Sequence, residues 1–396
     1  MSLITKEAIE GKKVNIKEFY NLPEKVIHCS KCVVSNQRPR IIFDENNVCS
    51  ACKFSEIKNN HTDWVSREKE LIDLLNKHRR KDGYWDVVVP CSGGKDSVYV
   101  AHILKEKYNM NPLTVTWAPM LYTDVGWRNH HNMIDSGIDN ILGTPDGKTH
   151  RILTKLSLEI MGDVFQPFIY GQKGFPMAVA INYKIPLVMY GENGEVEYGG
   201  SLKNADVPTH NVSDDMIKHY FSGMHPEDFE KYGIDKRKLN YYYPPKEEAA
   251  KEVGLENHFM SYYQKWIPQE NYYYSVENCG FEPEPDGRSE GTYQKYASLD
   301  DKVAGYHNYF AWLKFGHGRA TSDAAHEVRD GHINREEAVA LVKKYDGELP
   351  KKHFKEFLNY VDMTEEEFFK VCDRFRAEHL WDLHGDQWSL KKPVWK

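Results

Sequence analysis

In the middle of the chain, short apolar runs alternate with stretches in which apolar residues recur at helical spacing, and this change of pattern is clearest near residue 90. Residues 86–89 form a short apolar and β-branched run that ends at Pro90, which is typical of a buried strand. After a turn of small residues, apolar side chains recur between Val98 and Tyr108 at the spacing of one helix face. This pattern predicts a buried strand followed directly by an amphipathic helix.

The same alternation continues to residue 190. It predicts strands over 113–118, 139–143 and 185–190, and helices over 126–137, 149–161 and 175–184. A charged amphipathic helix over 64–80 leads into this part of the chain. Because strands that alternate with helices build parallel sheets, we expect an α/β fold.

The C-terminal third has a helical pattern throughout. Helices are expected over 299–314 and 335–345, from a cap at Thr321 to Gly331, and from Thr364 to near His379. We therefore divide the chain into a cysteine-rich segment (1–65), a central α/β domain (66–225) and a mostly helical C-terminal domain (226–396).

Composition limits the function classes. The 396 residues carry a net charge of −7, with 40% hydrophobic and 28% charged residues. An acidic chain argues against a large nucleic-acid surface, so no nucleic-acid partner is expected. The first residues lack an apolar signal core, and no apolar run approaches the length of a membrane span. We expect a cytoplasmic protein without a membrane partner.

Four of the seven cysteines form two pairs with the spacing Cys-x2-Cys. These are Cys29 with Cys32 and Cys49 with Cys52, separated by sixteen residues. Two such turns joined by a hairpin complete a tetrahedral four-thiolate site, which predicts a structural zinc ion. An iron–sulfur cluster is the alternative occupant.

The other cysteines, Cys91, Cys279 and Cys372, are interpreted as small apolar fillers. A pair that carries a persulfide is the alternative interpretation.

The turn after the first strand has the composition of an anion site. Its residues are Ser92, Gly93, Gly94 and Lys95, and Asp96 and Ser97 open the helix that follows. Paired glycines let the backbone approach an anion, the helix N-terminus points N–H groups at it, and the lysine adds a full charge. The Walker spacing is absent. The turn also resembles the PP-loop of the ATP pyrophosphatases, and this resemblance implies that these six residues bind the phosphates of ATP.

A second candidate segment, residues 191–200, follows the strand that ends at residue 190. Its composition predicts a turn-rich loop. We expect this loop to face the turn at residues 92–95, because both segments follow strand C-termini. Its carboxylates suit Mg²⁺, which a triphosphate requires. The predicted magnesium candidates are Asp96, Glu192, Glu195 and Glu197, and Gly191 and Asn193 are predicted to contact ATP. A solvated acidic loop is the alternative.

Two further features stay open at this point. Lys173 either faces the phosphates or lies in solvent at a helix start. The aromatic-rich region 241–274 is interpreted as core or interface, with a sugar or base site as the alternative.

Several motifs together resemble one family. They are the two cysteine turns, residues 91–97, residues 190–193 with 197–199, residues 290–301 and residues 315–321. Residues 92–97 are similar to the PP-loop of the ATP pyrophosphatases, and the whole set resembles the N-acetyl sugar amidotransferases. The resemblance implies an adenine nucleotide alpha hydrolase-like domain and an enzyme that adenylates a sugar N-acetyl group, releases pyrophosphate and substitutes ammonia. The product would be an acetamidino sugar for a lipopolysaccharide O-antigen or for flagellin glycans of the pseudaminic acid type.

The resemblance also suggests roles and partners. Lys95, Asp96 and Lys173 would be catalytic. Arg288, Lys295 and Arg319 are candidates for an anionic group of the sugar, although Arg288 is equally well explained as a surface cation. Ammonia would come from a separate HisH-like glutaminase subunit, with a HisF-like subunit as a further component, because this chain shows no glutaminase signature. The substrate would be a free or nucleotide-linked N-acetyl sugar.

Two other functions remain as alternatives at this stage. One is a tRNA-modifying enzyme with a PP-loop, and the other is a non-catalytic nucleotide sensor.

Overall fold

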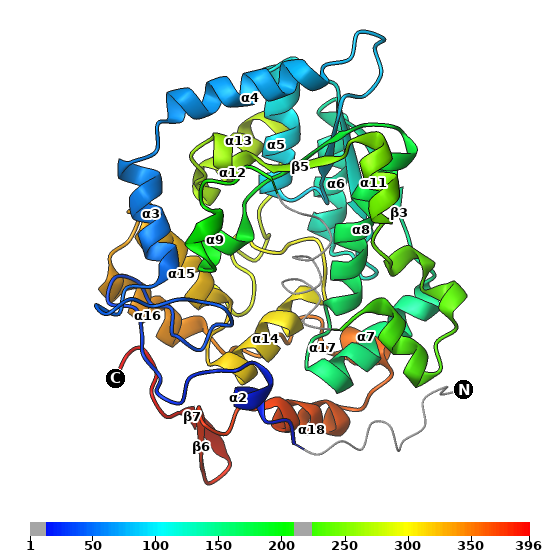
Figure 1. Ribbon diagram of the computed structural model, residues 1–396. Coiled ribbons are helices and arrows are strands. Elements are labelled where there is room, and N and C mark those ends of the chain that lie inside the picture. Colours follow the sequence, from blue (N-terminus) through cyan, green and yellow to red (C-terminus); the bar gives the residue numbers. More distant parts are fainter. Residues whose placement is uncertain (1–12, 210–223) are drawn as a thin grey trace.

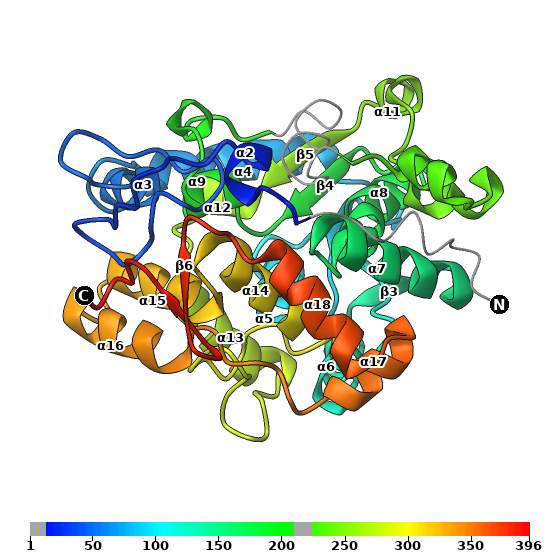
Figure 2. The ribbon, with the colours of Figure 1, turned by 90° about the horizontal axis from the view of Figure 1, so that it is seen from below.

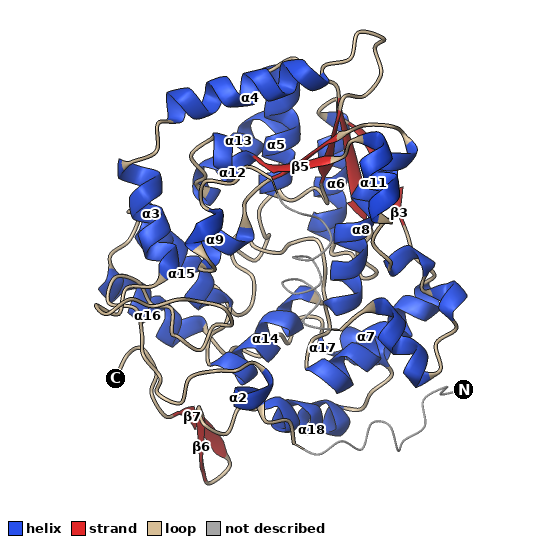
Figure 3. Ribbon diagram, in the orientation of Figure 1, coloured by secondary structure: helices blue, strands red, loops and turns tan. Residues whose placement is uncertain are grey.

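A five-stranded parallel sheet forms the centre of the molecule (Figures 1 and 3). The computed structural model describes residues 13–209 and 224–396. The strand order is β3-β2-β1-β4-β5. The strands are β1 (Val87–Pro90), β2 (Pro112–Trp117), β3 (Asp139–Gly143), β4 (Leu187–Tyr190) and β5 (Glu256–Phe259). The predicted α/β class with a parallel sheet is confirmed.

Strand β1 lies in the middle of the sheet. Val88 pairs with Leu113 of β2 on one side and with Val188 of β4 on the other. The chain leaves β1 toward β2 and returns to its other side at β4, so the strand order reverses between β1 and β4. In open parallel sheets, ligands bind beyond the strand C-termini at this reversal. The fold therefore places the turn after β1 beside the segment after β4.

Successive side chains of β1 point to opposite faces, so each face has its own core. Val87 and Val89 pack with helices α4 (Trp64–His78), α5 (Lys95–Glu106) and α12 (Met260–Tyr263). Val88 packs on the other face against α8 (Gln166–Asn182). Since helices cover both faces, the apolar strands β1, β2 and β4 are almost entirely buried, whereas the edge strand β3 is partly exposed. The helix α13 (Pro268–Cys279) packs along α5.

The C-terminal region forms a separate helical layer beside the sheet (Figure 2). Aromatic side chains dominate its core, and the rings of Tyr306 and Phe357 stack at 3.8 Å between centroids. A two-stranded antiparallel hairpin ends this layer. The elements are α14 (Ala304–Phe315), α15 (Arg319–Asp330), α16 (Arg335–Tyr345), α17 (Phe354–Val361), α18 (Glu365–Phe375), β6 (Trp381–His384) and β7 (Gln387–Leu390).

The remaining elements connect and cover these parts of the molecule. They are α2 (Ile16–Phe19), α3 (Ser50–Asn60), α6 (Asp124–Asp135), α7 (Gly147–Met161), α9 (Gly194–Tyr198), η1 (Leu202–Asn204), η2 (Pro226–Tyr232), η3 (Lys236–Lys238), η4 (Asn240–Tyr242) and α11 (Glu247–Val253). Among the described residues, no helix has both the length and the apolar character that crossing a bilayer requires.

Helix α8 corrects one sequence-based expectation. It begins at Gln166, nine residues before the predicted start, and it contains Gly171 and Pro176. A Cβ atom on Gly171 would lie 1.9 Å from the ring of Trp117 in β2. The glycine therefore serves close packing between helix and sheet, whereas the sequence pattern suggested a loop at this point.

Other boundaries also differ from the expectation. Helix α15 begins at Arg319 and is capped by Gly318, so Thr321 lies inside its first turn, where its hydroxyl bonds Asp346. Helix α14 begins at Ala304 rather than 299, and α18 ends at Phe375 rather than near 379. Strand β5, helix α17 and the β6–β7 hairpin lie in regions where no such element was predicted.

Candidate active site and metal centre

The turn between β1 and α5 requires glycine at its second position. Gly93 has φ of +92°, which side chains rarely adopt, and a Cβ atom there would lie 2.8 Å from the backbone of His130 in α6. The turn is therefore pressed against a neighbouring helix. This packing holds its backbone in one conformation.

The N-terminus of α5 has the properties of an anion site. Gly94 caps the helix without a side-chain hydrogen bond to its first N–H groups. The Ser97 hydroxyl donates to the Gly94 carbonyl at 3.0 Å, so it does not compete for those N–H groups. Unpaired N–H groups and the positive end of the helix dipole favour an anion such as phosphate.

Lys95 and Asp96 are fixed by contacts with α13. The ammonium of Lys95 forms an ion pair with the Asp96 carboxylate, whose other oxygen accepts from Asn271 Nδ2 at 2.9 Å. Ser275 donates to the Lys95 carbonyl at 2.8 Å. Two side chains of one helix thus hold the first turn of α5 in place.

The turn opens into a cavity of about 570 Å³. This size is within the usual range for a small-molecule site. Most of its wall comes from the β1–α5 turn, the end of β4, helix α8 and residues 296–319, and individual residues of β2, α6 and α9 also line it. The cavity therefore lies at the C-terminal ends of β1 and β4, where the strand order reverses.

Most of the residues predicted for the phosphate site meet in this cavity. Those that line it are Ser92, Gly93, Gly94, Lys95, Asp96, Ser97, Lys173, Gly191, Glu192 and Arg319. Lys173 lies within α8 rather than at a helix start, with its ammonium 5.1 Å from the centre of the Tyr190 ring. The cavity thus combines three cationic side chains with the carboxylates of Asp96 and Glu192.

The position of Glu192 in the cavity shifts the pKa of its carboxyl group. Burial and the nearby Asp96 carboxylate raise its pKa to about 7, although Lys95 and Lys173 oppose this shift. Two acidic groups that repel each other in a partly buried cavity are a donor set that suits a hard cation. Asp96 and Glu192 are therefore the pair of residues that fits Mg²⁺.

The remaining acidic candidates point elsewhere. Residues 194–198 form the short helix α9 and not the expected turn-rich loop. Asn193 caps this helix by accepting from the backbone N–H of Glu195 at 3.1 Å. The Glu197 carboxylate lies 3.1 Å from the ammonium of Lys58, and both side chains are buried. Asn193, Glu195 and Glu197 do not line the cavity.

Two of the three candidate sugar-binding cations also lie outside the cavity. Arg288 lines a neighbouring cavity of about 320 Å³ and forms a two-pronged ion pair with Glu348 at 2.7 and 2.9 Å. Lys295 is exposed, with its ammonium 5.2 Å from the centre of the Tyr272 ring. Arg319 lines the main cavity and donates to Asp323 at 2.9 Å.

Sequence reasoning did not single out several residues of the cavity wall. One of them is Asp300. Burial raises the pKa of its carboxyl, and a hydrogen bond with the Ser92 hydroxyl opposes part of this shift. His307 and Tyr198 also line the cavity. Asp300 and Tyr198 lie in the motifs 290–301 and 197–199, which did carry a signal, whereas His307 lies inside a helix and outside every motif.

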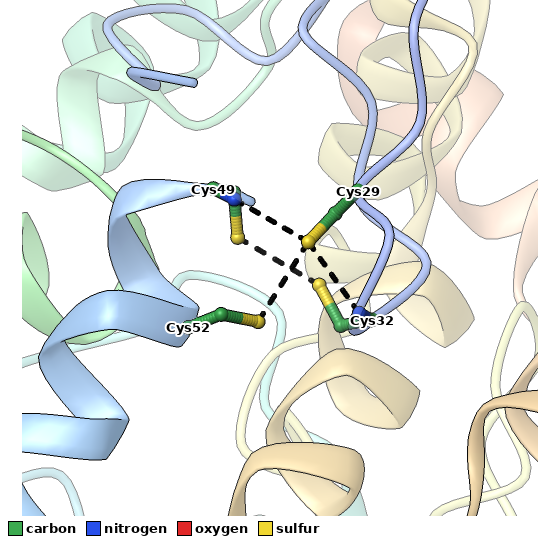
Figure 4. Close-up of side chains that lie close together, drawn as sticks. All are labelled: Cys29, Cys32, Cys49 and Cys52. Atoms are coloured by element: carbon green, nitrogen blue, oxygen red, sulfur yellow. Dashed lines mark hydrogen bonds between the residues drawn. The ribbon is translucent and has the colours of Figure 1, made fainter. Parts of the chain in front are cut away.

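The four paired cysteines converge on one point (Figure 4). The sulfur atoms of Cys29 and Cys52 are 3.8 Å apart, as are those of Cys32 and Cys49, and all four lie within 4.8 Å of one another. Thiolates placed tetrahedrally around zinc at about 2.3 Å are about 3.8 Å apart. The geometry fits a single zinc ion, because an iron–sulfur cluster would hold the sulfurs farther apart.

The surroundings of this metal centre support a structural role. Backbone N–H groups of Lys31, Cys32 and Cys49 donate to the Cys29 sulfur at 3.3 to 3.4 Å. Small side chains of α15 and α16 pack against it, and Arg335 donates to the carbonyls of Cys29 and Cys32. Four protein ligands leave no open position on a zinc ion, so the site can hold the segment to these helices but cannot bind substrate.

The three other cysteines are buried in apolar clusters. Cys91 and Cys279 belong to the core under α5, and Cys372 belongs to the helical layer. Burial raises the pKa of Cys91 to about 11 and that of Cys279 to about 12, so these thiols stay protonated. Their positions agree with the prediction of small apolar fillers.

Comparison with known proteins gives two matches. An uncharacterized protein of Methanocaldococcus jannaschii is 32% identical over 88 residues, which are 22% of this chain. The match spans only 31% of that protein's own length. Residues 290–394 match a family model described as the C-terminal domain of LPS biosynthesis protein WbpG-like proteins. This match supports a role in the synthesis of lipopolysaccharide or a related glycan.

Proposed function

We propose that this chain is an ATP-dependent amidotransferase of glycan synthesis. It adenylates the acetamide oxygen of an N-acetyl sugar, releases pyrophosphate and replaces AMP by ammonia to give an acetamidino sugar. One observation carries the proposal. The anion-binding turn at residues 92–95 and a wall from the LPS-biosynthesis-like segment, residues 296–319, enclose the same cavity.

The chemistry explains why a sugar-modifying enzyme would need this turn. An acetamide carbonyl is a poor electrophile, and its oxygen leaves badly. Adenylation converts the oxygen into a good leaving group and replaces one difficult displacement by two easier steps. Charge would develop on the departing pyrophosphate, and the backbone of Gly93 and Gly94 and the ammonium of Lys95, which line the cavity, would stabilise it.

The other residues of the cavity have complementary roles in this proposal. Asp96 and Glu192 would hold Mg²⁺, which would supply charge neutralisation for the phosphates. Lys173 adds a further cation for the phosphates. Arg319 supplies a guanidinium for a carboxylate or diphosphate of the sugar, since its planar donors match such oxyanions. The zinc ion would stabilise the fold of the cysteine segment.

Ammonia must arrive unprotonated and without excess water, since water would hydrolyse the activated imidate. We therefore include a separate glutaminase subunit of the HisH type, with a HisF-like component, as the ammonia source. The reaction would take place in the cytoplasm, where ATP is available.

The direct test incubates the chain with ATP, Mg²⁺, an ammonium salt and free or UDP-linked diacetamido sugars. We expect AMP and pyrophosphate in equal amounts, together with a sugar in which one NH group replaces one oxygen by mass spectrometry. Accumulation of ADP would contradict the proposal. Release of pyrophosphate that depends on tRNA rather than sugar would support the tRNA-modifying alternative.

A variant links this activity to the cavity. Asp96→Asn keeps the shape of the side chain and its bond to Asn271 but removes the charge. We expect pyrophosphate release to fall by about 10²-fold or more, since catalysis of phosphoryl-type transfer depends on such charges. The control Asp135→Asn changes an exposed carboxylate on α6 and should leave the rate unaltered.

A further inference from the structure

Helix α14 presents a histidine to the cavity. Ala304, His307 and Asn308 all line the cavity, and their spacing of three and four residues places them on one face of the helix. Among the described residues that line the cavity, His307 is the single histidine. The nucleotide-binding role described above does not use this side chain.

A buried carboxylate orients this histidine. Asp163 follows Gly162, the left-handed C-cap of α7, and its Oδ1 lies 2.8 Å from Nδ1 of His307. The same oxygen accepts from the backbone N–H of Phe165 at 2.8 Å. Asp163 is 8% exposed, so water competes little for this interaction. The two residues are 144 positions apart in sequence and meet only in the folded chain.

The electrostatics keep this carboxylate ionised. Burial would raise the pKa of Asp163, but the charge of His307, its hydrogen bond and the nearby Lys314 lower it to about 2. An ionised carboxylate accepts from Nδ1–H, which leaves Nε2 as the ring nitrogen that is not held by Asp163. Lys173 of α8 lines the same cavity, and the Phe165 ring lies 5.5 Å from the imidazole.

We propose that His307, oriented by Asp163, is the general base of the second half-reaction, in which ammonia displaces AMP. This inference rests on the proposed function. The attacking nitrogen forms a bond to the imidate carbon and passes one proton to Nε2 of His307. The bond between that carbon and the AMP oxygen then breaks, and its electron pair leaves with AMP. The imidazolium returns its proton to the former amide nitrogen, which gives the amidinium product.

The location of the pair separates it from the phosphate machinery. Asp96, Lys95 and Glu192 belong to the β1–α5 turn and the end of β4, whereas His307 belongs to the wall contributed by α14. A histidine is suited to proton transfer near neutral pH. A merely structural role is the competing explanation, because the hydrogen bond also ties α14 to the start of α8.

The variant His307→Gln separates these explanations. A glutamine amide can donate to Asp163 and preserve the tie between helices, but it cannot accept a proton. We expect sugar-dependent exchange of labelled pyrophosphate into ATP to stay within a few-fold of wild type, because adenylation precedes the base. Amidine formation should fall by about 10²-fold or more. The matched control His102→Gln removes a histidine that bonds Tyr274 outside the cavity, and should keep both activities.

A second readout needs no substrate. Nitrogen-resolved NMR of the histidine rings should show the Nδ1–H tautomer for a signal that disappears in His307→Gln. Asp163→Asn should shift that signal toward the Nε2–H tautomer and lower the rate of amidine formation. An unchanged tautomer, or amidine formation at the wild-type rate in His307→Gln, would overturn the inference. Wild-type chain that neither exchanges pyrophosphate nor forms an amidine would instead overturn the proposed function, and the inference with it.

Discussion

The ammonium of Lys58 lies 3.1 Å from the carboxylate of Glu197, and each side chain is 2% exposed. Lys58 also donates to the carbonyl of Trp266 at 2.9 Å and lies 3.7 Å from Asp330. Lys58 belongs to α3 of the cysteine segment, and Glu197 belongs to α9, which follows the cavity residue Glu192. This buried ion pair therefore connects the metal centre to the candidate active site.

Removal of Lys58 should destabilise the fold. In Lys58→Met, the carboxylate of Glu197 stays buried without its partner, which typically costs about 3–5 kcal/mol. We expect a loss of this order in the free energy of unfolding, measured by urea denaturation. The double variant Lys58→Met/Glu197→Leu replaces both charges and should recover part of the loss. Equal stability of Lys58→Met and wild type would show that the pair contributes nothing.

Alanine at Gly93 should abolish ATP use. The substitution strains a backbone with φ of +92° and places a Cβ atom 2.8 Å from the backbone of His130, so the turn must move. The matched control is Gly254→Ala, where φ is +69° but no atom lies within 4 Å of the added Cβ. Both variants should lose about 1–3 kcal/mol of stability from strain. Only Gly93→Ala should lose pyrophosphate release, and an active Gly93→Ala would contradict the assignment of the turn.

The cysteine cluster should bind one zinc ion per chain. Cys29→Ser removes the sulfur that accepts three backbone N–H groups, so we expect loss of metal, measured by elemental analysis, and a lower melting temperature. A chelator should have the same effect on the wild type. Cys372→Ser alters a buried cysteine outside the cluster and should keep the zinc. A metal-free wild-type chain of unchanged stability would contradict a structural zinc site.

The stability of the chain should depend on pH through Glu159. Burial raises the pKa of this carboxyl from 4.5 to about 7, and its Oε2 has no hydrogen-bond partner among the described residues. As pH rises from 4.5 to about 7, the unfolded chain releases this proton before the folded chain does. The contribution to stability therefore decreases across this window by at most about 3 kcal/mol, and it stays low at higher pH.

The variant Glu159→Gln should remove this dependence. Its melting temperature relative to wild type should rise between about pH 5 and about pH 8, because only the wild type must bury a charge at the higher pH. A constant difference across this range would contradict the raised pKa.

Local patterns were sufficient for the centre of the fold. Strand β1 and helix α5 were predicted because the β-branched run, the glycine turn and the helix face lie within a few adjacent residues. The parallel sheet followed from the alternation of strands and helices. The four cysteines also carry their spacing in the sequence, and the structure brings their sulfur atoms together.

Elements that depend on distant partners were missed. Strand β5 contains Glu256, Asn257 and His258, a polar sequence that becomes a strand because β4 offers it an open edge. Helix α9 has five residues, too few for a helical period to be visible. The β6–β7 hairpin did have a local signal, since Gly385 and Asp386 form its two-residue turn, but the helical pattern around it obscured that signal.

The residues of the candidate active site show the same difference between local sequence signals and contacts with distant partners. Residues 92–97 are contiguous, so one motif identified all of them, and all six line the cavity. Asn193 follows the cavity residue Glu192 in sequence but caps α9 and does not line the cavity. His307 and Asp163 are single polar residues in unremarkable surroundings, and only tertiary packing places them together. The sequence motifs therefore found the glycine turn and part of the wall at residues 296–319, including Arg319, but missed His307 and Asp163.

The cavity is lined by segments that lie far apart in the sequence, so it can form only late in the synthesis of the chain. The wall at residues 296–319 is synthesised about 200 residues after the glycine turn. Until that wall docks, a nascent chain has its phosphate turn open to bulk water. The order of synthesis thus delays closure of the cavity until residues 296–319 have folded onto it, and under the proposed function an incomplete chain could not use ATP.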